Sequence, residues 1–171
     1  MRVSRVWLLG GAVIGLWNRT AVGQRAPMRD DSSHVVFVCE HGTVKSVVAL
    51  EHFNRLAQAR GLNVRAVSRG THPDAAIPTP VRRGLEADGF DVAAFQPHSL
   101  SNNDLESALL VVVLDADVSA FDAGRVPIVR WDGLPSVSTS YPAGRNAIVT
   151  RVERLVDSLA HTRARKRRDT R

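Results

Sequence analysis

The feature that most constrains the fold is a series of short β-branched runs that alternate with helical stretches. Residues 34–38 (HVVFV) and 109–114 (LLVVVL) are almost continuously apolar and have the length of one buried strand of a parallel sheet. Residues 63–68 and 126–129 are weaker strand candidates. Helices are predicted over 46–60, 78–88, 101–106 and 143–160. Because strands that alternate with helices pair in parallel, we predict an α/β fold: a four-stranded parallel sheet flanked by helices on both faces.

Composition bounds the class of protein. The 171 residues suffice for one domain with a hydrophobic core, which we place at residues 34–160. The chain has one cysteine, Cys39, which excludes an intramolecular disulfide scaffold, a four-cysteine zinc site and an iron–sulfur cluster. Cys39 and His41 form no cluster of metal-ligand spacing with a third residue, so we expect neither a metal nor another cofactor.

The basic charge of the chain is concentrated at its two ends. The formal net charge is +6, yet residues 24–160 hold 14 Lys and Arg against 16 Asp and Glu. Specific nucleic-acid binding requires a basic face on the folded body, and this distribution argues against it. We expect residues 161–171 to form a basic disordered tail that is solvated or touches anionic surfaces.

The N-terminal segment has the layout of an export signal. Residues 1–5 are basic, residues 6–17 are an uncharged apolar run, and small residues follow up to Gly23. The apolar run is shorter than the roughly 20 residues that span a bilayer. We therefore predict a signal peptide at 1–23, a linker at 24–33 and a periplasmic or secreted protein. The alternatives are an uncleaved anchor, or a cytoplasmic protein whose translation starts at Met28.

The loop after the first strand carries the candidate chemistry. Residues 39–46 (CEHGTVKS) join a strand to a helix, where unpaired backbone N–H groups and the helix dipole favour an anion. Gly42 allows a tight turn there. Cys39 in that field is a candidate thiolate nucleophile, with the Lys45 charge and the Ser46 hydroxyl beside it. The alternative is a buried structural cysteine that ends a strand.

Several separated motifs resemble those of one known family. Cys39 is followed by five residues and then by Lys45 and Ser46, between the first strand and the first helix. The other matching segments are 68–71 (SRGT), 98–104 and 109–117 (LLVVVLDAD). With these motifs in order over residues 34–160, the chain resembles the low-molecular-weight protein-tyrosine phosphatases, a family that includes related arsenate reductases.

The resemblance implies a phosphatase-like fold and a cysteine-dependent phosphatase of phosphotyrosine-type monoesters. Cys39 would attack phosphorus and form a phosphocysteine intermediate, without a metal. Lys45 and the backbone N–H groups of the loop would hold the phosphoryl oxygens. The loop residues assigned to phosphate binding are Glu40, His41, Gly42, Thr43, Val44 and Ser46. The expected partner is a phosphorylated small molecule or a phosphoprotein.

The sequence also departs from the family pattern. Lys45 stands where the family has arginine, and the loss of that bidentate grip would cost about 10²–10³ in rate. Gly42 replaces an asparagine that orders the loop. Arg69 stands where alanine is usual, at the end of the second strand. We expect its guanidinium either to reach the loop as a substitute or to cover the sheet edge as a surface arginine.

The general acid is harder to assign, because the aspartate–proline pair of the family is missing before the last helix. Asp132 is the carboxylate in that loop, and we assign it to protonate the leaving oxygen and then to activate water. The alternative is an ordinary turn aspartate before glycine. Asp115 and Asp117, at the end of the third predicted strand, are expected to cap the next segment.

Three functions follow for the body of the chain. The first is the phosphatase with Cys39, Lys45 and Asp132 as catalytic residues. The second is a phosphate-binding or phosphoprotein-binding module that kept the loop and lost turnover. The third is an arsenate reductase that uses an external thiol, because a relay among cysteines of the same chain is excluded when Cys39 is alone.

Overall fold

The computed structural model describes residues 34–169. The predicted signal peptide (1–23) and linker (24–33) lie outside the described residues. No helix in the described part is long and apolar enough to cross a membrane.

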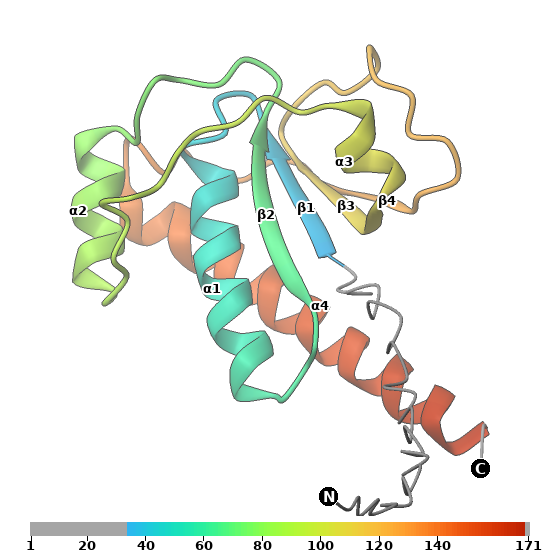
Figure 1. The fold of residues 1–171 in the computed structure, drawn as a ribbon. Coiled ribbons are helices and arrows are strands. Elements are labelled where there is room, and N and C mark those ends of the chain that lie inside the picture. The colour runs from blue at the N-terminus through green and yellow to red at the C-terminus, as the bar shows by residue number, and fades with distance from the viewer. Residues whose placement is uncertain (1–33, 170–171) are drawn as a thin grey trace, which may run out of the picture. The chain divides into compact units, whose positions relative to one another are not determined.

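Four strands form one parallel sheet: β1 (His34–Cys39), β2 (Arg65–Gly70), β3 (Ala108–Leu114) and β4 (Ile128–Trp131). Their spatial order is β2-β1-β3-β4, which places β1 and β3 at the centre (Figure 1). Within the described residues the two central strands are the two most apolar runs, because a central parallel strand is buried on both faces. The predicted α/β fold is confirmed.

Four helices accompany the sheet: α1 (Lys45–Ala59), α2 (Thr79–Ala87), α3 (Asn102–Glu106) and α4 (Tyr141–Asp169). The helix α1 packs against α4, and both cover one face of the sheet (Figure 1). The short helix α3 lies on the opposite face, where Leu105 joins a second apolar cluster. Helices therefore flank both faces, as predicted.

Alternation along β1 sorts its side chains between the two layers. Phe37 and Cys39 point into the larger core beneath α1 and α4, while Val36 and Val38 point into the smaller core on the α3 side. The same alternation decides where each residue at the carboxyl end of the sheet directs its side chain. Cys39 pairs in register with Gly70 of β2.

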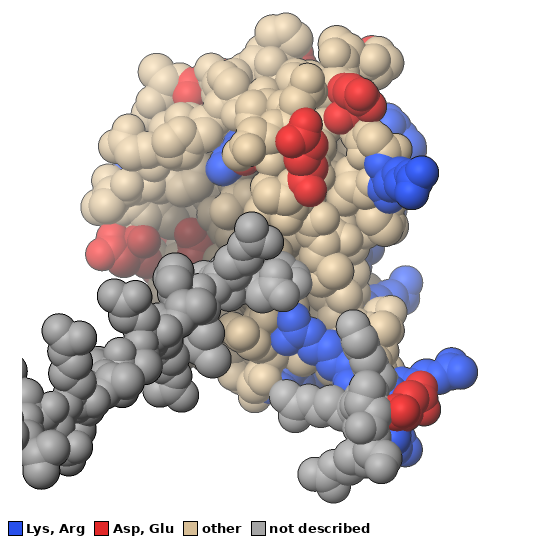
Figure 2. All heavy atoms as spheres, turned by 45° about the vertical axis from the view of Figure 1, so that its right-hand side comes forward, with Lys and Arg blue, Asp and Glu red and all other residues tan. Residues whose placement is uncertain are grey.

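The structure differs from the sequence predictions at some element ends. The strands β2 and β4 both begin two residues later than predicted, since pairing with β1 and β3 fixes their register. The helix α4 continues through Asp169, so residues 161–169 of the tail predicted to be disordered are helical. No proline or glycine interrupts the helix there, and Arg163 donates to the carbonyl oxygen of Asn63 across 2.9 Å. In Figure 2, basic side chains lie at the lower end of this face and again at its upper right, where acidic side chains stand beside them.

Candidate functional site

A pocket of about 250 Å³ opens at the carboxyl ends of β1 and β3, beside the first turn of α1. Its walls come from the loop after β1, the end of β3 and the loop between β4 and α4. Five of the predicted site residues line it: Cys39, Glu40, His41, Val44 and Lys45. The structure thus brings most of the predicted loop to the edge where open parallel sheets bind ligands.

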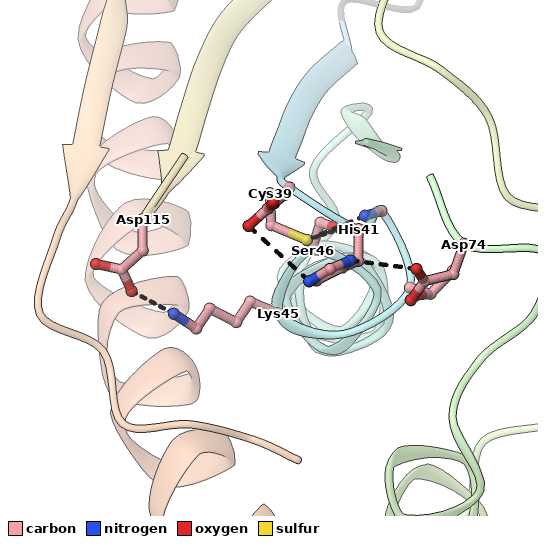
Figure 3. A network of polar contacts seen from close by, with 9 residues as sticks. Cys39, His41, Lys45, Ser46, Asp74 and Asp115 are labelled. Atoms are coloured by element: carbon pink, nitrogen blue, oxygen red, sulfur yellow. Dashed lines mark hydrogen bonds and ion pairs between the residues drawn. The ribbon is translucent and has the colours of Figure 1, made fainter. Parts of the chain in front are cut away.

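Cys39 is buried and hydrogen-bonded within this pocket (Figure 3). Its Sγ atom lies 3.0 Å from Oγ of Ser46, and the backbone N–H of Gly42 donates to Sγ across 3.2 Å. Ser68 of β2 donates to Oγ of Ser46 across 2.8 Å. When the Ser46 hydroxyl donates to sulfur, Sγ of Cys39 therefore accepts two hydrogen bonds, which hold the sulfur in place at the pocket.

Gly42 gives the loop its shape. Its φ of +65° lies in the left-handed region, and a Cβ atom there would lie 2.8 Å from the backbone nitrogen of Gly70. The carbonyl oxygen of Gly42 lies 2.9 Å from Oγ of Ser68 and is an alternative acceptor for the single proton of that hydroxyl. Close backbone packing against β2 thus holds the loop where its N–H groups can surround an anion.

The segment after β2 ties down the other side of the loop. Backbone N–H groups of Thr71 and His72 donate to the carbonyl oxygens of Cys39 and Glu40 across 3.2 and 2.8 Å. These two hydrogen bonds direct the carbonyl oxygens of Cys39 and Glu40 toward the segment after β2. The two oxygens therefore do not point into the space that an anion would occupy.

Lys45 is the first residue of α1, and its ammonium group is engaged (Figure 3). The Nζ atom lies 2.5 Å from Oδ2 of Asp115, which follows β3 with a φ of +47°. The Asp115 carboxylate also accepts hydrogen bonds from the backbone N–H groups of Gly133 and Leu134, across 2.6 and 3.2 Å. Burial acts to raise the pKa of Asp115, but the Lys45 and backbone donors outweigh it and lower that pKa overall.

Of the two alternatives left open for Arg69, the structure shows the one in which its guanidinium does not reach the loop. Strand alternation sends Ser68 toward α1 and Arg69 toward the α3 face, away from the Cys39 side of the sheet. Its Nε donates to Oδ1 of Asp104 across 2.8 Å, and Nη2 lies 2.7 Å from the same oxygen. The guanidinium therefore holds Asp104, the third residue of α3 and part of its capping box, rather than a ligand beside the cysteine.

The structure also places Asp132 away from the predicted site. Its side chain is 60% exposed and lies 3.5 Å from Nε of Arg130. It lines a separate hollow with Arg151 and Arg154, whereas the same loop presents Ser136 and other small or apolar residues to the Cys39 pocket. The expected general acid is thus not brought beside Cys39.

Two acidic residues near the loop were given no site role from the sequence. Asp115 was expected only to cap the next segment, but it accepts a hydrogen bond from Gly133, beyond β4, and pairs with Lys45. Asp74 accepts hydrogen bonds from residues of the loop although it is separated from them by β2. The sequence did offer a sign that Asp115 could belong to the site, because this carboxylate directly follows a central strand. It offered no such sign for Asp74. Among the described residues no group of three His, Cys, Asp or Glu could hold a metal ion.

The model of the low molecular weight phosphotyrosine protein phosphatase family matches residues 34–121, which include β1, the loop, α1 and β3. The chain belongs to this family. A protein of Halobacterium salinarum that is provisionally named an arsenate reductase is 26% identical over 104 residues, which cover 60% of this chain and 73% of that protein.

Solved structures share the fold at low identity. A thioredoxin-dependent arsenate reductase from Corynebacterium glutamicum superposes with a TM-score of 0.64 at 18% identity, over 76% of this chain and 63% of that chain. A low molecular weight protein tyrosine phosphatase from T. tengcongensis gives a TM-score of 0.63 at 22% identity, over 74% of this chain and 99% of that chain. The fold is therefore that of phosphatases and arsenate reductases alike.

Proposed function

We propose that this chain is a cysteine-dependent phosphatase of phosphate monoesters. The observation that carries the proposal is the buried sulfur of Cys39, with Ser46 and the Gly42 N–H directed at it where α1 begins. The thiolate attacks phosphorus, the S–P bond forms, and the bond to the leaving oxygen breaks. Water then hydrolyses the phosphocysteine and releases phosphate. The family membership supports a phosphorylated substrate, either a small molecule or a phosphoprotein.

Lys45 supplies the positive charge of the site. It lines the pocket, and its Nζ carries a single contact to the Asp115 carboxylate. A phosphate dianion in the loop would compete with that carboxylate for the ammonium group. Lysine offers charge without the planar fork of an arginine, so the grip on two phosphoryl oxygens is weaker.

The same ion pair favours a second candidate, a module that binds phosphate or a phosphoprotein with little turnover. If the Lys45 ammonium group keeps its ion pair with Asp115 during the reaction, it stabilises the transition state no more than the bound ground state. Catalysis requires interactions that strengthen in the transition state, so such a site would bind without reacting.

Arsenate reduction is the third candidate, and two relatives that are named as arsenate reductases support it. Cys39 is the one cysteine of the sequence, so both electrons for reduction would have to come through an external thiol. The loop would hold arsenate as it holds phosphate, since the two oxyanions have the same charge and shape.

One set of assays separates these functions. The full chain is purified under reducing conditions and tested for hydrolysis of an aryl phosphate, for protection from thermal unfolding by phosphate, and for thiol-dependent release of arsenite. Hydrolysis that Cys39→Ser abolishes supports the phosphatase. Protection without hydrolysis, with activity gained in Lys45→Arg, supports the binding module. Arsenite release that requires both added thiol and Cys39 supports the reductase.

A further inference from the structure

His41 stands inside the signature loop and faces the pocket that contains Cys39. Its side chain is about half exposed, at 49%, so a bound ligand can reach it. The Nδ1 atom lies 3.2 Å from Oδ1 of Asp74, and Figure 3 shows this contact on the side of the loop opposite Lys45. The imidazole is therefore attached at one nitrogen and accessible at the other.

Asp74 is itself held in place. Its Oδ2 accepts a hydrogen bond from Oγ1 of the buried Thr43 across 2.9 Å, and its backbone N–H donates to the carbonyl oxygen of His41 across 3.1 Å. One carboxylate thus spans two residues of the loop and fixes the orientation of the ring. An aspartate bound to Nδ1 selects the form in which Nδ1 carries a proton, which leaves Nε2 for chemistry.

The second ring nitrogen has no hydrogen bond to any described residue. The nearest charged partner of Nε2 is Oε2 of Glu40 at 3.9 Å, beyond hydrogen-bond distance. Glu40 is 63% exposed, so this interaction is screened by solvent. Lys45 and Asp115 also line the pocket, but they are paired with one another.

Two carboxylates that could be considered for proton transfer, Asp115 and Asp132, are poorly suited to it. Asp115 accepts three hydrogen bonds, which hold it as a carboxylate. Asp132 lies with Arg130 outside the pocket. A leaving alkoxide or phenoxide needs a proton as its bond to phosphorus breaks, and an imidazole ring can donate that proton and later accept one from water.

We propose that His41 is the acid–base catalyst of this site and that Asp74 is its positioning residue. The assignment rests on the proposed phosphatase function. In the first step Cys39 sulfur bonds to phosphorus, the P–O bond of the ester breaks, and the Nε2 proton of the His41 imidazolium moves to the leaving oxygen. In the second step neutral Nε2 takes a proton from water as the water oxygen bonds to phosphorus. The S–P bond then breaks, which restores both the thiolate and the imidazolium.

The test compares two esters that differ in their need for a proton. Phenyl phosphate releases a basic phenolate, whereas dinitrophenyl phosphate releases an anion that leaves without protonation. For His41→Gln, we expect kcat/KM for phenyl phosphate to fall about 100-fold, within the range of general acid catalysis, while kcat/KM for dinitrophenyl phosphate changes less than about threefold. Because the second step uses His41 as base, this variant also accumulates phosphocysteine in a burst with the dinitrophenyl ester.

Further variants separate catalysis from structure. Asp74→Asn should show the same selective loss for phenyl phosphate at smaller size, and Asp74→Glu should restore part of it. Asp117→Asn, at a carboxylate that contacts Ser119 outside the pocket lining, is the matched control and should leave both esters unchanged. Asp132→Asn is measured beside it as the test of the rival carboxylate. The unfolding temperature of each variant is measured with and without inorganic phosphate. A variant whose loop no longer binds phosphate is then recognised by the loss of stabilisation.

The outcomes separate this assignment from the function on which it rests. If His41→Gln slows both esters equally or neither, with phosphate protection intact, then His41 is not the acid and the phosphatase proposal stands. A selective loss in Asp132→Asn would likewise overturn the assignment in favour of the carboxylate. If the wild-type chain hydrolyses neither ester, both the proposed function and the role of His41 are wrong.

Discussion

The Nζ atom of Lys45 lies 2.5 Å from Oδ2 of Asp115, and this ion pair joins the first turn of α1 to the end of β3 across the pocket. The two side chains are 20% and 26% exposed, so solvent screens the pair only in part. Any anion that binds in the loop must compete with Asp115 for the ammonium group. The carboxylate thereby sets how much positive charge the site offers.

Replacing Asp115 with asparagine should strengthen the binding of inorganic phosphate. The variant removes the competing charge, while asparagine tolerates the positive φ and keeps one oxygen for the Gly133 N–H. We expect the dissociation constant to fall about fivefold, equivalent to about 1 kcal/mol, when phosphate binding is followed by calorimetry. The control is Asp117→Asn, which removes the same charge from a residue that contacts Ser119 outside the pocket lining. Equal or weaker binding in Asp115→Asn would show that Lys45 is not restrained by this pair.

Replacing Gly42 with alanine should abolish phosphate binding. The new Cβ would lie 2.8 Å from the Gly70 nitrogen, so the loop must move. Gly61→Ala is the matched control, because its φ of +62° imposes the same backbone strain with no atom within 4 Å. Both variants should lose about 1 kcal/mol of stability from the left-handed backbone, but phosphate should raise the unfolding temperature only of Gly61→Ala. Phosphate protection that persists in Gly42→Ala would place the anion elsewhere.

Replacing Arg69 with methionine should affect stability rather than activity. Burial raises the pKa of Asp104, and the hydrogen bonds from Arg69 and Ser101 more than offset it, so the native state holds a carboxylate there. Without the guanidinium, we expect the free energy of unfolding in urea to fall by about 2 kcal/mol, because a buried charge loses its partner. The kcat/KM for an aryl phosphate should change less than about twofold. A selective loss of phosphate binding in this variant would restore Arg69 to the site.

The buried His52 of α1 makes stability depend on pH. Its ring packs against Phe90, and its Nε2 lies 3.4 Å from Oδ2 of Asp88. Burial lowers the pKa of His52 to about 4, although the Asp88 carboxylate acts in the opposite direction, while Arg55 and Arg145 add to the lowering. Below about pH 6.5, His52 therefore binds a proton in the unfolded chain that it does not bind in the folded chain. The free energy of unfolding consequently falls as the pH drops from about 6.5 toward 4.

His52→Gln should remove this component of the pH dependence. Between pH 7 and pH 4 the wild type should lose up to about 3 kcal/mol more stability than the variant, as measured by urea unfolding at each pH. The comparison between the two proteins cancels the titration of the carboxylates. Parallel stability curves for wild type and variant would mean that His52 takes up its proton as readily in the folded state.

The local parts of this architecture could be predicted from the sequence. β1 and β3 are continuous apolar runs, and their side-chain chemistry alone marks them as buried strands. The loop from Cys39 to Ser46 follows a strand directly, so a single motif in chain order was enough to locate it. The ends of β2 and β4 were two residues off, because pairing with the neighbouring strand rather than local propensity decides where they begin.

The contacts that depend on tertiary placement could not be predicted. Lys45 and Asp115 are 70 residues apart in the chain, and only the parallel pairing of β1 with β3 brings them together. Arg69 was considered for its position at the end of the second predicted strand, and Asp132 was assigned as the carboxylate in the loop before the last helix. Strand alternation directs the Arg69 side chain to Asp104 on the other face of the sheet. The chain after β4 is exposed, and there Asp132 pairs with Arg130 instead of reaching Cys39.

In the proposed reaction, the sulfur of Cys39 bonds covalently to phosphorus during turnover. This bond can be tested by rapid acid quench of the full chain during turnover of an aryl phosphate under reducing conditions, followed by mass spectrometry of the peptide that contains Cys39. We expect one added phosphoryl group on Cys39 in the wild type and none in Cys39→Ser, whose hydrolysis is also lost. Steady hydrolysis with an unmodified Cys39, or hydrolysis that survives in Cys39→Ser, would contradict it.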